Sequence, residues 1–157
     1  MKKLVLLLVL TALLSACQDK TVYRTPSEAD IDAILNSATD EERFWLLDKE
    51  DVDFALSLTS EEYQNAWMWI DRSGTTIDEI VIITAKDDFA DSVYQKLENY
   101  ITHAKTNKKD WLESYNAKEA AKLENGKLFR YGNTMGYVFL ENDEQTDLLA
   151  SLNDFFS

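Results

Sequence analysis

The sequence predicts an α+β domain with a mostly antiparallel sheet of about four strands and helices packed on one face. Three observations support this. Two strand-like runs stand next to each other at 66–71 and 77–85, separated only by a turn. A long segment with helical spacing follows them. Two more short apolar runs then precede an amphipathic C-terminal segment. Because the strands come in pairs, antiparallel pairing is favoured over repeated βαβ units.

The N-terminal part of the domain predicts one helix and one ambiguous element. Thr25 is an expected N-cap, with Pro26 in the first turn and Glu28 closing a capping box. The helix has one apolar face, formed by Ile31, Ile34 and Leu35. The apolar block at 44–47 fits either a helix or a buried strand, and the mixed segment 48–58 predicts a loop or a short element.

The residue pattern of the two strand-like runs indicates which sides of each strand are apolar. In the run at 66–71, Trp67 and Trp69 share one side and alternate with apolar residues on the other. The segment 77–85 is rich in β-branched residues and apolar on both sides over 80–83, which indicates a central strand.

The second half of the chain predicts a long helix from about residue 88, a short helix, a hairpin and a closing helix. The long helix has apolar residues at helical spacing: Phe89, Val93, Leu97, Tyr100, Ile101 and Ala104. After a solvated bend at 105–110, the chain either continues this helix or starts another. Asn116 caps the short helix, which Gly126 ends. The hairpin comprises 128–131 and 137–141 around Gly132-Asn133, and Asp143 caps the closing helix.

A targeting segment precedes the domain. A basic start is followed by an apolar run at 4–14, which is typical of a secretory signal and shorter than the roughly 20 residues of a membrane-spanning helix. Leu14, Ser15, Ala16 and Cys17, the single cysteine, resemble the bacterial lipobox. This resemblance implies a cleaved signal peptide at 1–16 and a diacylglyceryl thioether on Cys17.

The resulting organisation is a lipidated cysteine with a short tether at 17–25 and a single domain at 26–157. We expect the protein to lie on the extracytoplasmic face of the cell membrane, held there by its lipid. Cleavage removes two lysines and changes the net charge from −13 to −15, which opposes binding to nucleic acid. With Cys17 modified, no thiol remains for a disulfide, so the core alone must stabilise the fold.

Three motifs, in order, resemble those of small lipoproteins common in Gram-positive bacteria, which carry a domain of unknown function. The first is Ile77-Asp78-Glu79-Ile80 continuing to Asp87, the second is Tyr115-Asn116 with Glu119 to Glu124, and the third is Gly132-Asn133 with Tyr137-Val138. The chain departs from the family pattern at Ala117, where proline is usual, and by an insertion at 134–136. The resemblance implies a location and a fold type, and it assigns no catalytic residue.

Catalytic and metal-binding patterns are not evident in the sequence. His103 is the only histidine, and it is expected on the surface near the end of the long helix. The acidic run at 48–53 lacks the glycine and the ligand spacing of a calcium loop. Asp78 and Glu79 would serve as an acid–base pair only if burial separated their pKa values, so a structural role is favoured.

The tryptophans leave two interpretations open. Trp67 and Trp69 either fill the layer between sheet and helices, which is the favoured interpretation, or form an exposed binding face with Asp78 and Glu79. We therefore expect a membrane-anchored envelope lipoprotein without enzymatic activity, metal or cofactor, which binds or scaffolds another envelope protein. The alternative is a module that binds a small molecule or a glycan.

Overall fold

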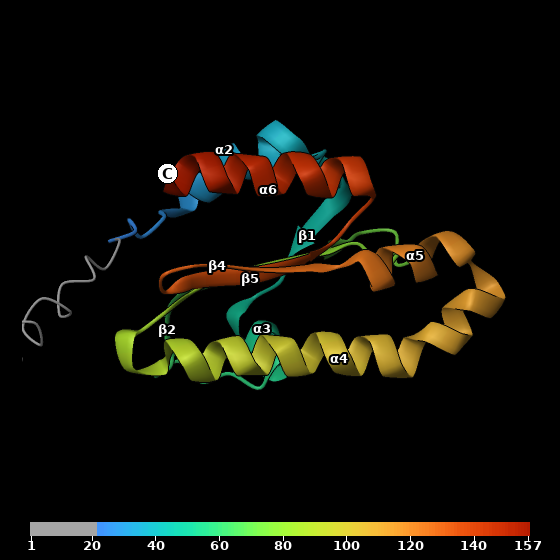
Figure 1. Ribbon diagram of the computed structural model, residues 1–157, viewed down its shortest axis with the longest axis horizontal. Coiled ribbons are helices and arrows are strands. Elements are labelled where there is room, and N and C mark those ends of the chain that lie inside the picture. The colour runs from blue at the N-terminus through green and yellow to red at the C-terminus, as the bar shows by residue number, and fades with distance from the viewer. Residues whose placement is uncertain (1–21) are drawn as a thin grey trace, which may run out of the picture.

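The computed structural model describes residues 22–157, apart from the side chain of Glu41, and shows a five-stranded sheet between two layers of helices (Figure 1). The strands are β1 (Phe44–Leu46), β2 (Tyr63–Asp71), β3 (Glu79–Ala85), β4 (Lys127–Tyr131) and β5 (Thr134–Phe139). Their order is β1-β2-β3-β5-β4, and all neighbours are antiparallel. The predicted α+β class is therefore confirmed. The additional strand is β1, which comes from the ambiguous block at 44–47 and follows a 3₁₀ turn, η2 (Glu41–Arg43).

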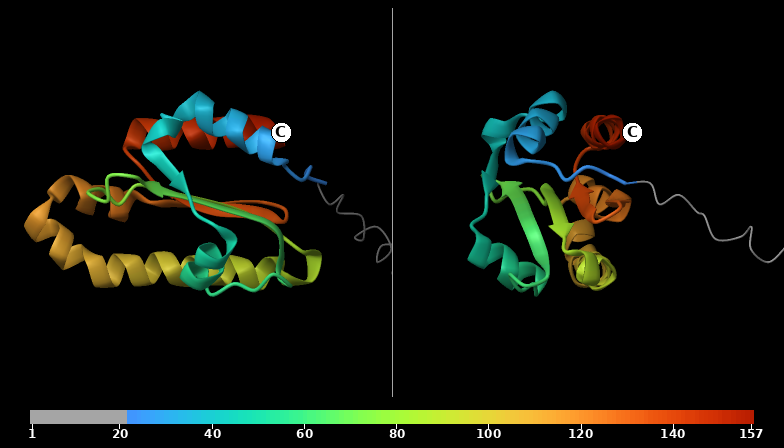
Figure 2. Two further views of the ribbon diagram at one scale, coloured as in Figure 1. Left: turned by 180° about the vertical axis from the view of Figure 1, so that it is seen from behind. Right: turned by 90° about the vertical axis from the view of Figure 1, so that its left-hand side faces the viewer.

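The central strands have apolar residues on both faces of the sheet. Trp67 pairs with Ile82 and Met68 with Val81 in the register of β2 with β3. Trp67 and Trp69 belong to the core on one face, whereas Met68 and Val81 belong to the core on the other. Each of these apolar faces of the sheet must be covered by helices to be kept from water. The expectation that helices pack on one face is therefore wrong, because helices cover both (Figure 2).

One layer consists of α2 (Glu28–Ala38) and α6 (Asn142–Phe156), which lie side by side. Ser27, not Thr25, is the N-cap of α2. Its side chain accepts a hydrogen bond from the Asp30 amide, and the Asp30 carboxylate accepts one from the Ser27 amide. The capping box therefore lies two residues later than expected, because Ser27-x-x-Asp30 offers the same reciprocal bonds. The cap position of α6 is Glu141 instead of Asp143.

The other layer consists of α3 (Lys49–Leu56), a 3₁₀ turn η3 (Asp87–Phe89), α4 (Ala90–Tyr115) and α5 (Ala117–Asn125). α4 is continuous through 105–110, so the expected bend is absent. Asn116 caps α5 by accepting a hydrogen bond from the Lys118 amide, as predicted, and Gly126 ends that helix. Among residues 22–157, no helix is both long enough and apolar enough to cross a membrane.

The hairpin of β4 and β5 turns at Gly132-Asn133, with Gly132 at a φ of 60°. Tyr131 pairs with Thr134 across the turn. The apparent insertion at 134–136 is therefore the first half of β5, which begins three residues earlier than predicted. Glycine suits this turn because a positive φ carries no penalty without a Cβ.

Part of the expected tether packs against the domain. We call residues Tyr23–Pro26 the N-terminal strap. Tyr23 lies edge-on to Tyr131, and the Arg24 guanidinium carbon lies 3.3 Å from the ring centroid of Phe155. The strap meets the domain at the end where the β4–β5 hairpin turns (Figure 1).

Candidate functional site

The residues that the sequence suggested for binding do not form one site. Trp67 and Trp69 are only 8% and 5% exposed, in the core beneath α2 and α6. They fill the layer between sheet and helices, as the favoured interpretation predicted, and they provide no exposed tryptophan face. Glu79 contacts Tyr100 of α4 and Tyr137 of β5, and Asp78 belongs to a cluster of ion pairs.

Asp78 lies in a buried ion-pair cluster that joins the start of β3 to α5, η2 and α6. The Lys122 ammonium lies 2.6 Å from Asp78 Oδ1 and 3.1 Å from Glu119 Oε1. Arg43 lies 2.9 Å from the other oxygen of Asp78 and 2.6 Å from Glu144. Burial raises the pKa of Asp78, while the hydrogen bond from Lys122 and the nearby Arg43 charge oppose the rise. Each of these carboxylates pairs with Lys122 or Arg43, which indicates a structural role.

The Glu79 carboxylate lies beside two tyrosine hydroxyls. It accepts hydrogen bonds from the Tyr137 hydroxyl and, at 3.3 Å, from the Tyr100 hydroxyl. The two tyrosine rings stack with their centroids 5.3 Å apart, which holds both hydroxyls near the carboxylate. Burial raises the pKa of Glu79, and the tyrosine hydrogen bonds oppose that rise without cancelling it. The folded protein therefore holds the Glu79 proton more tightly than the unfolded chain does.

In the Glu79→Gln variant the free energy of unfolding should fall less, as pH rises, than it does in the unchanged protein. A raised folded-state pKa means that the folded protein binds more protons, so stability falls as pH rises from the ordinary value of 4.5 through the folded-state pKa. Glutamine does not ionise, and its amide oxygen still accepts a hydrogen bond from Tyr137. Urea unfolding between about pH 4.5 and about pH 8 should show a gain for the variant that grows with pH. A difference independent of pH would contradict this explanation.

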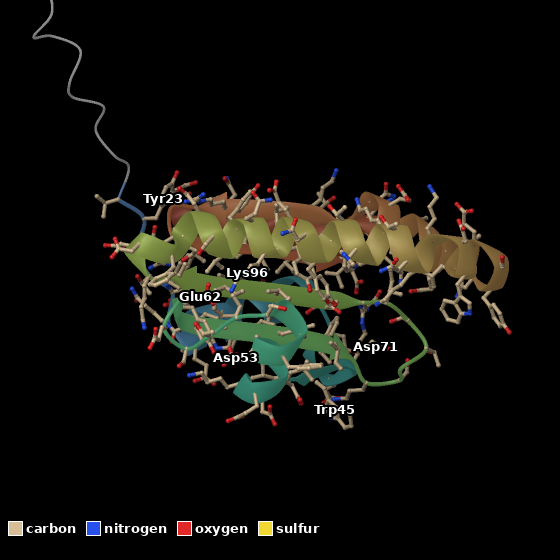
Figure 3. All side chains as sticks on the ribbon, turned by 90° about the horizontal axis from the view of Figure 1, so that it is seen from below. Tyr23, Trp45, Asp53, Glu62, Asp71 and Lys96 are labelled. Atoms are coloured by element: carbon tan, nitrogen blue, oxygen red, sulfur yellow. The ribbon has the colours of Figure 1, made fainter. Side chains whose placement is uncertain are left out.

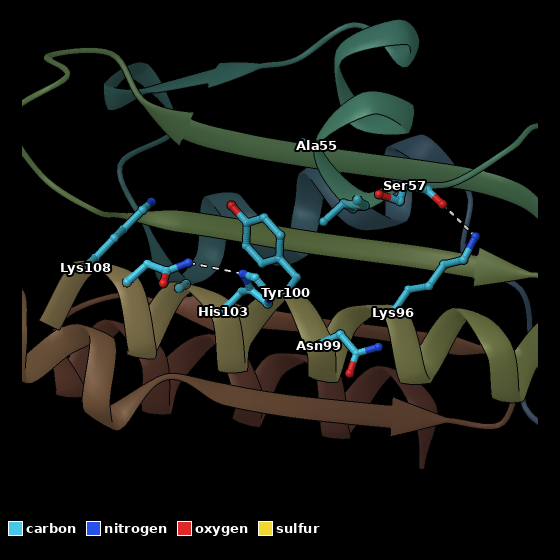
Figure 4. A pocket seen from close by; sticks show the side chains of 10 residues that line it. Ala55, Ser57, Lys96, Asn99, Tyr100, His103 and Lys108 are labelled. Atoms are coloured by element: carbon cyan, nitrogen blue, oxygen red, sulfur yellow. Dashed lines mark hydrogen bonds between the residues drawn. The ribbon is translucent and has the colours of Figure 1, made fainter.

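α3 lies beside α4 (Figure 3), and the residues between them line an open groove of about 540 Å³. α4 contributes polar residues and one aromatic residue at helical spacing: Lys96, Asn99, Tyr100, His103, Asn107 and Lys108. Ala55 and Leu56 come from the C-terminal end of α3, across the groove (Figure 4). The groove exists because α3 has only 8 residues, whereas α4 has 26. The short helix leaves part of the surface beside α4 uncovered.

The residues that line the groove are less acidic than the chain as a whole. None of its ten lining residues is acidic, although the chain has 29 Asp and Glu residues. Lys96 is held at one end by Glu62, at 2.7 Å, and by the Ser57 carbonyl, at 2.6 Å (Figures 3 and 4). Lys108, at the other end, makes no ion pair with the side chains that the structure describes, although its charge lowers the pKa of Glu79. Because Glu62 already pairs with Lys96, Lys108 is the lysine of the lining that would attract a ligand with negative charge.

The acidic run at 48–53 stabilises local structure. Asp48 is the N-cap of α3 and accepts a hydrogen bond from the Asp51 amide at 3.0 Å. Asp53 accepts one from the Tyr63 hydroxyl at 2.5 Å. In the part of the chain that the structure describes, no group of three or more His, Cys, Asp or Glu side chains is arranged to hold a metal ion.

Comparison with known proteins places the domain in a family. A model described as Domain of unknown function (DUF4358) matches residues 37–140, which is more than half of the chain. The chain belongs to the DUF4358 family. A model of the prokaryotic membrane lipoprotein lipid attachment site matches residues 1–18. These matches confirm the resemblance to a small bacterial lipoprotein with a domain of unknown function. No curated protein and no solved structure matches the chain.

Both walls of the groove lie inside the DUF4358 region, because α3 and α4 fall between its limits. The predicted lipidation site, Cys17, and the lipobox residues Leu14, Ser15 and Ala16 lie outside the described residues and within the lipid attachment match. The two matches therefore cover separate parts of the chain, one for attachment and one for the domain.

The sequence contained part of the signal for this groove. His103 is exposed, as expected, but α4 continues well beyond it, and its ring nitrogen lies 3.1 Å from the Asn107 amide. Lys96, Asn99 and His103 recur at intervals of three and four residues, which places them on one stripe of the helix. The opposite wall had no such signal, because the position of α3 depends on the tertiary fold.

Proposed function

We propose that this DUF4358 protein is lipid-anchored through Cys17 on the extracytoplasmic face of the cell membrane and binds an acidic segment of another envelope protein, without catalysis. The lipid attachment match at residues 1–18 supports the anchor. The observation that carries the binding proposal is the groove between α3 and α4, whose lining has no acidic residue in a strongly acidic chain.

The shape and chemistry of the groove support a polypeptide ligand. Ala55 and the Tyr100 ring are partly exposed and give the groove apolar surface, whereas Leu56 and Ala104, which also line it, are buried. Amides and cationic side chains line it as well. A segment with alternating apolar and acidic residues would bury the former and place the latter near Lys108 and His103. Elsewhere the acidic surface of the protein would repel the same segment, so charge would direct it to the groove.

The other candidate functions have less support. The glycan hypothesis depended on exposure of Trp67 and Trp69, and both are buried. For an enzyme, the groove offers His103, but the partner of its ring nitrogen is an amide and no carboxylate lines the groove. A histidine that acts as a base is usually oriented by an acidic group.

Site-specific photo-cross-linking in intact cells tests the proposal. A photoreactive residue at Asn99 should capture an envelope protein, and the captured peptide should contain Asp or Glu residues. The same residue at Asp147, which is exposed on α6, should not capture that peptide. Lys108→Glu should lower capture at Asn99 about tenfold, because it reverses the charge at the open end of the groove. Lys118→Glu makes the same charge change on α5, outside the groove, and should have little effect.

Three results would count against the proposal. Equal capture at Asn99 and Asp147, or capture that Lys108→Glu does not alter, would show that the groove is not the binding site. Cys17→Ser should release the protein from the membrane fraction. If that variant stayed with the membrane, the anchor would be assigned to the wrong residue.

A further inference from the structure

The N-terminal strap determines where the chain leaves the domain. The Tyr23 ring lies edge-on to Tyr131 and Phe156, with centroid distances of 6.1 and 6.2 Å. A Cβ placed on Gly132 would lie 2.9 Å from Tyr23 Cδ2, so the ring lies directly against the hairpin turn. Pro26, at the other end of the strap, is buried. The strap is therefore packed against the domain at more than one point.

The distance from the strap to the lipid is short. Only residues 18–22 separate Tyr23 from Cys17. Six residue steps of extended chain span at most about 20 Å. A lipid on Cys17 therefore keeps the strap end of the domain within about 20 Å of the membrane surface, whatever path these residues take.

α4, which lines the groove, begins at the strap end of the domain and runs away from it. Asp87 of η3 and Asn133 of the hairpin turn line the same hollow as Tyr23, so α4 begins at the strap end. The 26 residues of α4 then extend about 39 Å to the opposite end of the domain (Figure 1). There Trp111 and Tyr115 stack with centroids 5.3 Å apart and are 60% and 79% exposed.

We propose that the strap end of the domain lies against the outer surface of the lipid bilayer and that α4 points away from it. The groove then opens at increasing distance from the membrane, from Lys96 to Lys108, and Trp111 with Tyr115 is the most distant part. This inference rests on the lipid anchor of the proposed function. At this end Asp87 and Asp88 offset the positive charges of Arg24 and Lys86, so the strap and the lipid, and not a net charge attraction to the headgroups, set the orientation.

Quenching by membrane-bound nitroxides tests this orientation. The full lipidated protein is reconstituted in phosphatidylcholine vesicles that contain a lipid with a nitroxide headgroup. A fluorophore is placed on Asp88→Cys, near the strap, or on Ser114→Cys, at the far end of α4, and both positions are exposed. The acylated Cys17 does not react with the label. We expect quenching several-fold stronger at position 88 than at position 114, and the same ratio when phosphatidylglycerol is added.

The strap itself is tested with a matched pair of variants. Tyr23→Ser combined with Arg24→Ser removes the three ring contacts of the strap and should bring quenching at the two positions closer together. Val22→Ser changes a residue that is 92% exposed and should leave the ratio unchanged. Equal quenching at 88 and 114 in vesicle-bound protein would overturn the orientation while leaving the anchor intact. Protein that does not float with the vesicles would instead overturn the anchor.

Discussion

Lys122→Met should lower the free energy of unfolding by about 3–5 kcal/mol. The Lys122 ammonium is buried and lies within 3.1 Å of both Asp78 and Glu119, whose side chains are buried as well. Methionine fills a similar volume, so the loss comes from leaving two buried carboxylates near one another with only Arg43 to compensate. Urea unfolding followed by tryptophan fluorescence would measure it.

The matched control is Lys109→Met, on the exposed side of α4. Lys109 pairs with Glu124 at 3.1 Å, but the two side chains are 44% and 46% exposed, so water screens the pair. Its loss should cost less than about 1 kcal/mol. If the Lys122 variant does not fold, Lys122→Arg keeps the charge and should be affected less. Similar small losses for Lys122→Met and Lys109→Met would show that the buried cluster contributes little to stability.

Gly136→Ala should cost about 3 kcal/mol or more, because the strand has no room for a side chain there. A Cβ on Gly136 would lie 1.8 Å from the Val81 carbonyl oxygen and 2.7 Å from Phe129 Cζ. β5 is paired with β3 on one side and with β4 on the other, so its backbone cannot move without breaking ladder hydrogen bonds. Thermal unfolding of the purified variant would show the loss as a large fall in Tm.

Gly74→Ala provides the comparison, because its cost has another origin. Nothing lies within 4 Å of a Cβ at Gly74, but the residue has a φ of 64°. Alanine in that conformation costs about 1 kcal/mol. Gly74→Asn, which tolerates a positive φ better, should recover part of it. If Gly74→Ala were as damaging as Gly136→Ala, crowding would not explain the effect in β5.

The elements that the sequence predicted correctly are those marked by a local pattern, such as alternation in a strand or a capping residue at the end of a helix. Alternation around Trp67 identified β2, and Asn116 and Gly126 marked the limits of α5. The layer arrangement was harder to predict. The apolar residues on both sides of β3 indicate a central strand, and they also require helices on both faces of the sheet, because each apolar face must be covered.

The groove and the buried cluster depend on contacts between distant parts of the chain. Asp78 and Lys122 are 44 residues apart, and no local pattern marks them as partners. The groove requires α3 to end beside the middle of α4, which follows from how both helices pack on the sheet. Only its α4 side, with Lys96, Asn99 and His103 on one stripe, could have been read from spacing.

The two helical layers also differ in how they relate to the family region at 37–140. All strands and the groove-side helices lie inside it, whereas most of α2 and all of α6 lie outside. A fragment cut at these limits would keep the groove but lose Leu148 and Leu152, which cover Trp67 and Trp69. The uncovered face would then promote aggregation. Family members that lack these flanking helices would have to cover the same face of the sheet in another way.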